Sequence, residues 1–415
     1  MIGGFTLNAI KVILVFGFLI FIHELGHFLV AKKVGIKVHE FALGFGNKLW
    51  SITKGETTYS IRLLPIGGFV RMEGEEQHSD DERSFNKKTI GERMAVVFAG
   101  PLMNIFLAVL IFFGLNMFAM GYYSNYINTV EEKSQAYIAG VRPGDKIIKL
   151  NDRTIRIWEE VKWIMRSNYN KQVKLTVLRN GEPKDFYVDP YMKLNFQMSQ
   201  PNIVTSIEEG TGLDRLGLKV GDKIKSINGI TINSSEQVEK VIRESDSNRL
   251  KFVIERNSKI NEKEFDAPFV RQYLIGFTST IIKGDLKGLF YNSFWKNIFI
   301  VKIMLSETYR LLTGKVGMEQ LMGPVGIATE ISNTQKFLDL FQLGAYISLS
   351  LGIANLIPFP PLDGGKILTL SIEAIRRKPL KPENEAMISM VGFSLLILLL
   401  IVVSYNDFLR QVFNR

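Results

Sequence analysis

The sequence predicts a multi-pass α-helical membrane protein with four transmembrane helices and two inserted α+β domains. Four stretches of the 415-residue chain, at roughly 5–30, 94–120, 341–372 and 386–403, are long and apolar enough to cross a bilayer, which takes about 20 such residues. The long polar region between the second and third stretches contains one segment twice. A hydrophobic content of 46% and a mean hydropathy of +0.10 suit a mixture of membrane and water-soluble parts.

The composition excludes several classes of site. The chain has no cysteine, so disulfides, thiolate metal sites and cysteine nucleophiles are impossible, and nitrogen and oxygen must bind any metal. A formal charge of +10 would suit nucleic acid only if the basic residues gathered on one face. We expect no nucleic-acid partner, because the densest cluster lies in the short loop between the last two apolar stretches, which is typical of a cytoplasmic side: Arg376, Arg377, Lys378 and Lys381.

The first apolar stretch contains ionisable side chains in LIFIHELGHFLVA, residues 19–31. It starts without a basic run and carries these residues before any cleavage site, so we interpret it as a retained span and not as a secretory signal peptide. An ionisable side chain at membrane depth costs roughly 2.5–3.5 kcal/mol, which makes a solvated helix face a poor explanation. A bound cation would offset this cost.

His23, Glu24 and His27 form the pattern H-E-x-x-H. On a helix, residues four apart lie on one face about one turn, or roughly 6 Å, apart, so two imidazoles can bind one cation. Glu24 lies about 100° around the helix from His23, close enough to act as general base on an attacking water. Gly26 leaves this face uncrowded. The pattern predicts a metal site that serves hydrolysis.

The third apolar stretch is interrupted by NLIPFPPLDGG, residues 355–365. A broken backbone at membrane depth is tolerated only where protein or a water-filled cavity satisfies it, so the break indicates a site. Hydrolytic zinc usually takes three protein ligands, and Asp363 is the only acidic residue here. A helix N-cap after the proline turn is the alternative role. We favour the ligand, because a carboxylate at membrane depth needs a partner, and expect one Zn2+ per chain.

The distribution of lysine and arginine predicts the topology. The loop at 32–93 and the loop between the last two stretches are rich in these residues, so both should be cytoplasmic, with the active site toward that side. Both termini and the region from 121 to about 283 then lie on the opposite side. For 288–312, which carries four charged residues, we prefer an amphipathic helix at the membrane surface over a fifth span, with Tyr291 and Trp295 at headgroup level.

The polar region contains two copies of one module. AGVRPGDKIIKLNDRTI (139–155) aligns without gaps to LGLKVGDKIKSINGITI (216–232), at a constant offset of 77 residues that matches Asp145 with Asp222. Each copy shows a Gly-Asp turn, a short alternating strand, a helix and another strand. Turn chemistry explains the glycines and aspartates individually. The whole module resembles tandem PDZ domains of the bacterial kind, which implies a sheet edge and groove for an extended peptide end.

Several motifs, in order, resemble the site-2 protease family (peptidase family M50) of intramembrane zinc metalloproteases. They are H-E-x-x-H, AGPLMN at 99–104, GPVGIA at 323–328 and N-x-x-P-x-P-x-L-D-G at 355–364. With two PDZ-like modules between its second and third spans, the chain is similar to the RseP-type members, over nearly its whole length. The resemblance implies that His23, His27 and Asp363 bind zinc. It also implies that Glu24 activates the attacking water and that Asn355 and Pro358 lie along the substrate path.

Family members also have a hairpin-like loop that dips toward the active site after the first span. The matching positions are 57–74, whose alternating, β-rich start and paired Gly67 and Gly68 predict a bent strand edge. Such an edge could pair with an unwound substrate. An ordinary cytoplasmic hairpin is the alternative to this membrane-associated placement.

The resemblance implies an enzyme of the inner membrane that cleaves the transmembrane segments of single-span proteins. Candidate substrates are anti-sigma factors and signal-peptide remnants, and the PDZ-like modules would control access or bind peptide ends. The alternative from another class is a non-catalytic PDZ membrane scaffold. A transporter is a third possibility, but it predicts repeated spans, and the only repeat lies in the polar region.

The predicted organisation follows from these assignments. It comprises the first span with H-E-x-x-H (1–33), a loop with the hairpin (34–92), the second span (93–120), two PDZ-like domains (121–198 and 199–275), the surface helix and linker (276–335), the broken third span (336–373), a cytoplasmic loop (374–385), the fourth span (386–405) and a tail (406–415).

Overall fold

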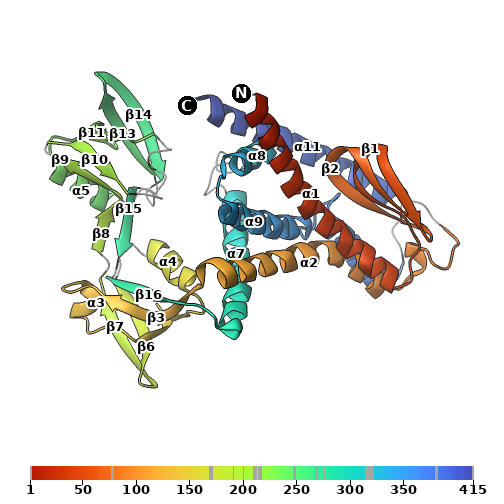
Figure 1. The fold of residues 1–415 in the computed structure, drawn as a ribbon, viewed down its shortest axis with the longest axis horizontal. Helices are drawn as coiled ribbons and strands as arrows, with labels where there is room; N and C mark the ends of the chain where they lie inside the picture. Colours follow the sequence, from red (N-terminus) through yellow and green to blue (C-terminus); the bar gives the residue numbers. More distant parts are fainter. Residues whose placement is uncertain are drawn as a thin grey trace. The chain divides into compact units, whose positions relative to one another are not determined.

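The chain forms two compact units in a computed structural model (Figure 1). The first combines Met1–Gly121 with Lys283–Phe413 and consists of helices and one β-hairpin, whereas the second, Tyr122–Ile282, consists mainly of sheets. The structure describes residues 2–75, 79–167, 172–189, 191–199, 201–208, 213, 217–245, 249–266, 270–274, 276–313, 322–378 and 382–413.

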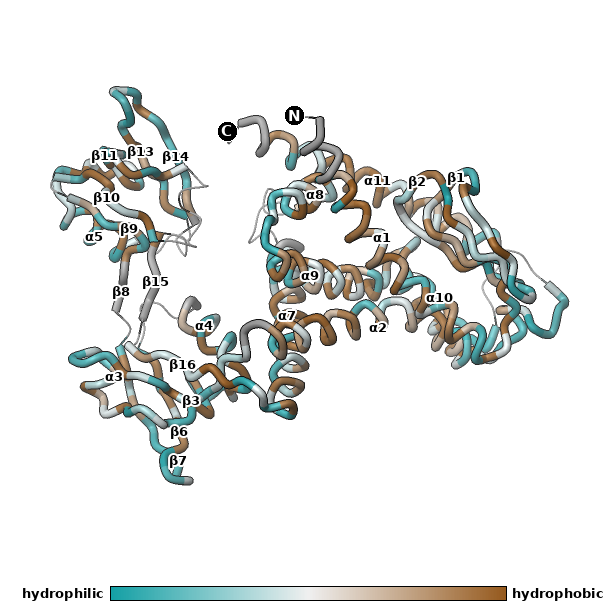
Figure 2. Tube along the Cα trace, in the orientation of Figure 1, coloured by the Kyte–Doolittle hydropathy of each residue, from teal (hydrophilic) through white to brown (hydrophobic). Residues whose placement is uncertain are grey.

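The helical unit contains the four long apolar helices that the sequence predicts. The described helices of this unit are α1 (Ile2–Lys33), the short 3-10 helix η1 (Phe85–Lys87), α2 (Ile90–Leu115), which continues into the π-helical turn η2 (Asn116–Met120), α7 (Leu286–Leu312), α8 (Pro324–Asn333), α9 (Phe337–Asn355), α10 (Asp363–Arg376) and α11 (Pro382–Phe413). Among the described residues, α1, α2, α9 and α11 are long and apolar enough to cross a membrane. Figure 2 shows their largely hydrophobic course.

α2 lies at the centre of this unit, in contact with α1, α7, α9 and α10. Small residues on its neighbours let the backbones approach closely. A Cβ atom at Gly26 of α1 would collide with the carbonyl of Ala99, and one at Gly352 of α9 would lie 2.8 Å from the carbonyl oxygen of Pro101. α1 and α9 are therefore held against the same short stretch of α2.

The predicted break in the third apolar stretch is present as the connection 356–362 between α9 and α10. This connection folds back onto the first turn of α10, where a side chain at Gly364 would collide with the carbonyl of Ile357. α11 packs against it as well, because Gly392 leaves room for the carbonyl of Pro360. The irregular backbone is thus in contact with protein on two sides.

The first unit also contains a hairpin of two bent strands, β1 (Val38–Lys54) and β2 (Thr57–Met72). Leu43 of β1 aligns with Gly68 of β2 on one side and with Ile61 of β2 on the other. Four strand segments therefore lie side by side, in the order 50–54, 57–61, 40–43 and 68–71.

This hairpin differs from the expected one. The segment 57–74, matched to a hairpin-like loop, is a single bent strand over most of its length, and its partner is the preceding segment 38–54. β1 bends at Gly44 and Gly46, which have φ of 86° and 83°. Because these bends interrupt the alternation of polar and apolar residues, the pattern of β1 does not read as a strand.

The two faces of the hairpin differ in polarity. One face buries the Glu40 carboxylate, which accepts hydrogen bonds from Ser60 and Arg62, both at 2.7 Å. Burial would raise the pKa of this carboxyl, but its hydrogen bonds to Ser60, Arg62 and Lys48 outweigh burial and hold the pKa below its ordinary value. The other face packs Phe41 against the aromatic rings of α1 and exposes large apolar side chains farther out: Trp50, Ile52, Ile61 and Leu63.

The second unit contains two modules of similar topology, as the repeat predicts. Each has a sheet, a helix that packs on it and a core of its own. The first comprises β3 (Tyr122–Val130), α3 (Gln135–Ile138), β4 (Lys146–Leu150), β5 (Arg153–Thr154), α4 (Trp158–Ser167), β6 (Val173–Arg179), β7 (Glu182–Val188) and β16 (Phe277–Ile282). The second comprises β9 (Phe196–Ser199), β10 (Ile203–Ile207), β11 (Lys223–Ile227), β12 (Ile230–Thr231), α5 (Ser235–Glu244), β13 (Arg249–Arg256) and β14 (Lys259–Asp266).

The second module is inserted into the first. β16 follows the second module in sequence, yet it pairs antiparallel with β3, and β8 (Tyr191–Leu194) pairs with β15 (Arg271–Leu274) where the chain leaves and returns. The predicted boundary at 275 therefore cuts off the last strand of the first module, which falls in the predicted linker 276–335. The predicted boundary at 198 falls inside β9 and assigns most of this strand of the second module to the first. Sequence similarity could not reveal β16, because the repeated segment does not extend to it.

The repeat conserves one ion pair in both modules. Asp145 is buried and binds the guanidinium of Arg179 through both carboxylate oxygens, each at 2.7 Å. Asp222 binds Arg256 in the same way, at 2.6 and 2.7 Å. Turn chemistry therefore explains only part of the Gly-Asp motif. Its carboxylate also joins the turn to the strand that carries the arginine.

The helix expected at 288–312 is present as α7, but its buried side is polar. α7 packs against α2 and α9, and Ser293 accepts a hydrogen bond from the Asn116 side chain of η2 at 3.2 Å. Asn297 donates to the carbonyl of Ser293 at 2.8 Å. The helix therefore contacts the bundle through small polar groups as well as through the apolar side chains of Ile300 and Val301. Its outer side is apolar and aromatic: Phe290, Tyr291 and Phe294.

α8, which carries the GPVGIA motif, is bound at both ends by charged side chains. Asp407 of α11 accepts hydrogen bonds from the backbone N–H groups of Gly323 and Gly326, at 3.0 and 2.8 Å. Lys11 of α1 donates to carbonyls at the other end: Ile331, Ser332 and Thr334. Both charges complement the helix dipole, so α8 joins α1 to α11.

Asp407→Ala should destabilise the helical unit, because it leaves a buried and a partly buried N–H group without their acceptor, and a buried group left unsatisfied costs about 1–3 kcal/mol. Thermal unfolding of the purified full-length chain would report this as a lower melting temperature. Asp339→Ala is the matched control, since Asp339 is an exposed acidic residue in the first turn of α9 and its loss should change stability by no more than about 0.5 kcal/mol. Equal effects of the two substitutions would contradict the assignment.

Candidate metal centre

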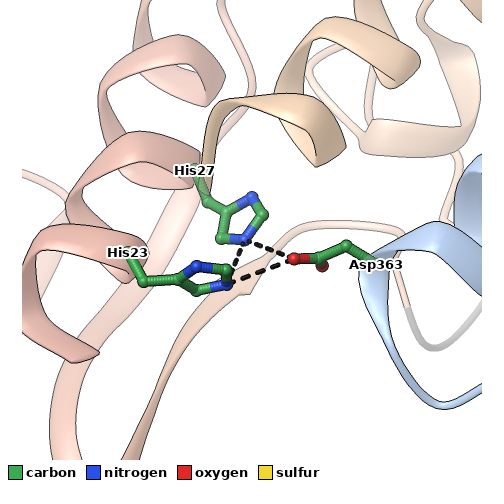
Figure 3. Close-up of side chains that lie close together, drawn as sticks. All are labelled: His23, His27 and Asp363. Atoms are coloured by element: carbon green, nitrogen blue, oxygen red, sulfur yellow. Dashed lines mark hydrogen bonds and ion pairs between the residues drawn. The ribbon is translucent and has the colours of Figure 1, made fainter. Parts of the chain in front are cut away.

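Three potential metal ligands from distant parts of the chain converge in the helical unit (Figure 3). Oδ2 of Asp363 lies 3.1 Å from Nε2 of His23 and 3.5 Å from Nε2 of His27. The two Nε2 atoms are 3.3 Å apart. Both histidines are buried, and each residue is 8% exposed. The two histidines come from α1 and the aspartate from α10.

The chemistry of these three groups fits zinc. Zn2+ in hydrolytic sites binds imidazole nitrogen and carboxylate oxygen, commonly from three protein ligands. Oδ2 of Asp363 is buried and, within the described part of the chain, receives no properly aligned hydrogen bond. A cation among the three atoms would satisfy it. The alternative for Asp363, a helix N-cap, is wrong, because Leu362 occupies the N-cap position and Asp363 is the first helical residue.

The backbone of α2 orients one of the imidazoles. Nδ1 of His27 lies 2.8 Å from the carbonyl oxygen of Val96. Since a carbonyl can only accept, Nδ1 carries the proton and Nε2 keeps the lone pair that a metal requires. The amide of Asn104, also on α2, lies beside the ring of His23. Neither partner was predicted from the sequence. A lone asparagine in an apolar span, in AGPLMN, was the available signal for the second.

Gly100 of α2 provides the space for the His27 ring. A Cβ atom at Gly100 would collide with the ring, at its Nε2 and neighbouring carbons. Together with the contact of Gly26 against Ala99, this explains two glycines of the motifs as points where α1 and α2 approach closely.

An ion pair fixes α10, the helix that begins with Asp363. The guanidinium of Arg93 on α2 binds both carboxylate oxygens of Glu373, at 2.5 and 3.1 Å. The side chains are 11% and 15% exposed, so solvent screens the pair little. α2 therefore contacts both elements that supply the potential ligands.

Glu24 lies on α1 beside the edge of the hairpin sheet. Its side chain is half-buried, and a Cβ atom at Gly68 of β2 would lie 3.0 Å from its Cγ. Gly68 belongs to segment 68–71, the outer edge of the sheet, which pairs with β1 on one side only among the described strands. Gly67 has φ of 96° and packs against the ring of Phe45, so it forms the bend in β2.

The other two predicted site residues lie near the break. Asn355 is the last residue of α9 and is half-buried, and Pro358 is exposed in the connection 356–362. Neither belongs to the cluster of potential ligands. Their contact with substrate stays a prediction.

Comparison with known proteins identifies the family. Residues 11–399 match the family model described as Peptidase family M50. The chain belongs to this family. Its curated relatives extend over almost the same length as this chain. The zinc metalloprotease RasP of Geobacillus kaustophilus is 32% identical over 96% of this chain and 97% of its own length.

Two further relatives carry names that refer to sigma factors. The regulator of sigma-W protease RasP of Bacillus subtilis is 30% identical over 98% of this chain and 99% of its own length. The regulator of sigma E protease of Haemophilus influenzae is 27% identical over 94% of this chain and 96% of its own length. The M50 match covers both the H-E-x-x-H helix and the segment with Asp363.

Gly100→Ala should lower peptidase activity by about 100-fold, because the new methyl group forces the His27 ring out of its position. The rate at which the reconstituted enzyme cleaves a membrane-bound protein substrate measures this. Gly114→Ala on the same helix is the control, since nothing lies within 4 Å of its Cβ position and alanine favours a helix. A similar loss of activity in both variants would show that helix packing, not the ring, is affected.

Proposed function

We propose that the chain is an intramembrane zinc metalloprotease, which hydrolyses peptide bonds in the transmembrane segments of single-span membrane proteins. The observation that carries this proposal is the convergence of His23, His27 and Asp363. A glutamate next to the first histidine and an open strand edge beside that glutamate support it.

The proposed ligands are Nε2 of His23, Nε2 of His27 and Oδ2 of Asp363, which bind one Zn2+ per chain. When bound, zinc polarises the scissile carbonyl and makes the attacking water more acidic. The protein holds these ligands through the Val96 carbonyl and the Arg93–Glu373 ion pair. Burial between helices limits the access of bulk water.

Glu24 is the proposed general base. It follows His23 directly, so its carboxylate projects about 100° around the helix from that ligand. There it takes a proton from the attacking water and delivers it to the nitrogen of the leaving amine. Since it is not a member of the ligand cluster, its carboxylate keeps both oxygens for proton transfer.

Segment 68–71 is the proposed docking edge for the substrate. The peptide bonds of a transmembrane helix are hydrogen-bonded within the helix, so the helix must unwind before hydrolysis. Pairing with a strand edge replaces the lost backbone hydrogen bonds. Gly68 lacks a side chain, so Glu24 can lie directly against this edge, and Gly67 supplies the bend. Asn355 and Pro358 are proposed to lie farther along the path.

The four long apolar helices are proposed to span the inner membrane. On this proposal the basic loops lie in the cytoplasm, with the centre toward that side, and both termini lie in the periplasm with the sheet unit 122–282. The apolar outer face of the hairpin, with Trp50 and Ile61, suits contact with the membrane. A purely cytoplasmic hairpin would leave this face in water.

The two inserted modules are proposed to be PDZ-like domains that control access. Each has its own core and a sheet with an open edge among the described strands, the requirements for binding an extended peptide end. Substrates with a bulky outer domain would be excluded until another protease trims them. The sigma-factor names of two relatives favour anti-sigma factors as substrates, with signal-peptide remnants as a second class.

A non-catalytic scaffold is the alternative, and zinc content separates the two. Wild-type protein should contain about one zinc per chain and cleave a single-span substrate. Glu24→Gln should keep the metal and lose about 100- to 10,000-fold in rate, the usual contribution of a general base. Asp363→Asn should lose most of the zinc.

Each result bears on one assignment. Normal turnover by the Glu24→Gln variant would show that Glu24 is not the general base. Full zinc content in the Asp363→Asn variant would show that Asp363 is not a zinc ligand. Wild-type protein without stoichiometric zinc would favour the scaffold.

Removal of the sheet unit should permit cleavage of untrimmed substrates. Tyr122 and Ile282 are paired neighbours across β3 and β16, so residues 122–282 can be replaced by a short linker without separating the helices they join. Cleavage of a pre-trimmed substrate should be unchanged and serves as the control. If full-length substrates stayed resistant while trimmed ones were cleaved, the access filter would be ruled out.

A further inference from the structure

Asn104 of α2 carries a buried amide beside the ring of His23. The residue has no exposed surface, and its Nδ2 lies 3.3 Å from Nδ1 of His23. Its Oδ1 is buried and has no hydrogen-bond partner among the described residues. An amide oxygen in this position costs about 1–3 kcal/mol when it is left unsatisfied. The site therefore contains a buried amide whose role the three potential ligands alone do not account for.

The orientation of this amide decides which nitrogen of His23 carries the proton. With Nδ2 toward the ring, Nδ1 accepts, so the ring proton sits on Nε2 and points to Asp363 at 3.1 Å. With Oδ1 toward the ring, Nδ1–H donates and Nε2 keeps its lone pair. The two orientations differ by half a turn of the terminal torsion and have nearly the same shape. Only the second leaves His23 able to bind a metal.

The backbone of Asn104 is fixed by α9. Its carbonyl oxygen accepts a hydrogen bond from the hydroxyl of Ser348 at 2.8 Å, and both residues are fully buried. Ser348 lies on the helix that leads to the break and to Asp363. Asn104 therefore lies between α1, which carries His23, and α9, which leads to the break before Asp363.

Residues on one side of α2 contact both imidazoles. The Val96 carbonyl faces Nδ1 of His27, Gly100 makes room for that ring, and Asn104 faces Nδ1 of His23. These three positions are four residues apart, so they share one side of α2. His27 has a partner that can only accept, and the same requirement applies to His23 if both rings bind one cation.

We propose that Asn104 is a positioning residue for His23, whose side-chain oxygen accepts the Nδ1 proton and thereby directs the Nε2 lone pair to the metal. This inference rests on the proposed zinc site. Partners of this kind typically change metal affinity by 10- to 100-fold when removed. Asn104 touches no substrate in this role, so its effect should be on metal binding first.

Zinc affinity of the purified full-length chain, measured by competition with a chelator, tests this proposal. Asn104→Leu keeps the approximate shape and removes the acceptor, so zinc should bind 10- to 100-fold more weakly. Asn104→Asp keeps an acceptor and removes the donor, so zinc affinity should stay within about threefold of wild type or rise. Excess zinc should restore proteolysis by the Leu variant.

The control is Asn297→Leu. Asn297 is a buried asparagine on α7 whose Oδ1 also lacks a partner among the described residues, but it lies outside the ligand cluster. Its loss should leave zinc affinity unchanged. If the Asn104→Leu variant does not fold, the Asn104→Asp variant alone tests the proposal. Aspartate cannot donate the hydrogen bond that an amide can, so zinc affinity would fall in this variant if Asn104 acted as a donor to His23.

The outcomes separate this proposal from the function it rests on. Wild-type zinc affinity in the Asn104→Leu variant, or a large loss in the folded Asn104→Asp variant, would overturn the role of Asn104. Failure of the wild-type chain to bind zinc would instead overturn the metal site itself.

Discussion

The organisation of the helical unit depends on one contact, the meeting of Asp363 with His23 and His27. These residues are separated by most of the chain, and each carries lone pairs that repel one another unless a proton or a cation lies between them. Bringing them together requires an irregular connection before α10, in contact with α11 where Gly392 admits the carbonyl of Pro360. It also requires the Arg93–Glu373 ion pair, which holds α10 against α2.

α2 contributes none of the proposed ligands, yet it contacts every element that does. Two of its residues position the His27 ring. Gly100 has no side chain where this ring lies, and the backbone carbonyl of Val96 accepts a hydrogen bond from it. A motif such as AGPLMN is easily taken for a simple packing sequence, because its glycine and proline allow helices to approach closely. Here the same close approach sets the positions of two imidazole rings. The close approach of α2 to its neighbours is therefore required both for helix packing and for the geometry of the candidate metal centre.

Much of the fold and most of the candidate site could be predicted from sequence, for identifiable reasons. The apolar helices follow from length and composition, and His23, Glu24 and His27 follow from a fixed helical spacing. Asp363 could be selected because an isolated carboxylate in an apolar segment needs a partner. The same argument applies to Asn104, but an uncharged amide gives a weaker signal. β1 and β16 could not be found from the sequence. Bends break the alternation of β1, and β16 pairs with residues 147–160 positions earlier in the chain, which leaves no local pattern.

If substrate docks at segment 68–71 as proposed, the position of Gly68 would link the choice of substrate to the chemistry. An extended segment paired with the edge 68–71 would run about 4.8 Å from that strand, which itself lies against Glu24. A helical segment could not pair in this way, because its backbone groups are already bonded to one another. Pairing of an unwound substrate with the edge 68–71 would therefore place its peptide bonds near Glu24 in the same step. An enzyme built this way would need no separate recognition of sequence at the bond it cuts, only a segment that unwinds easily.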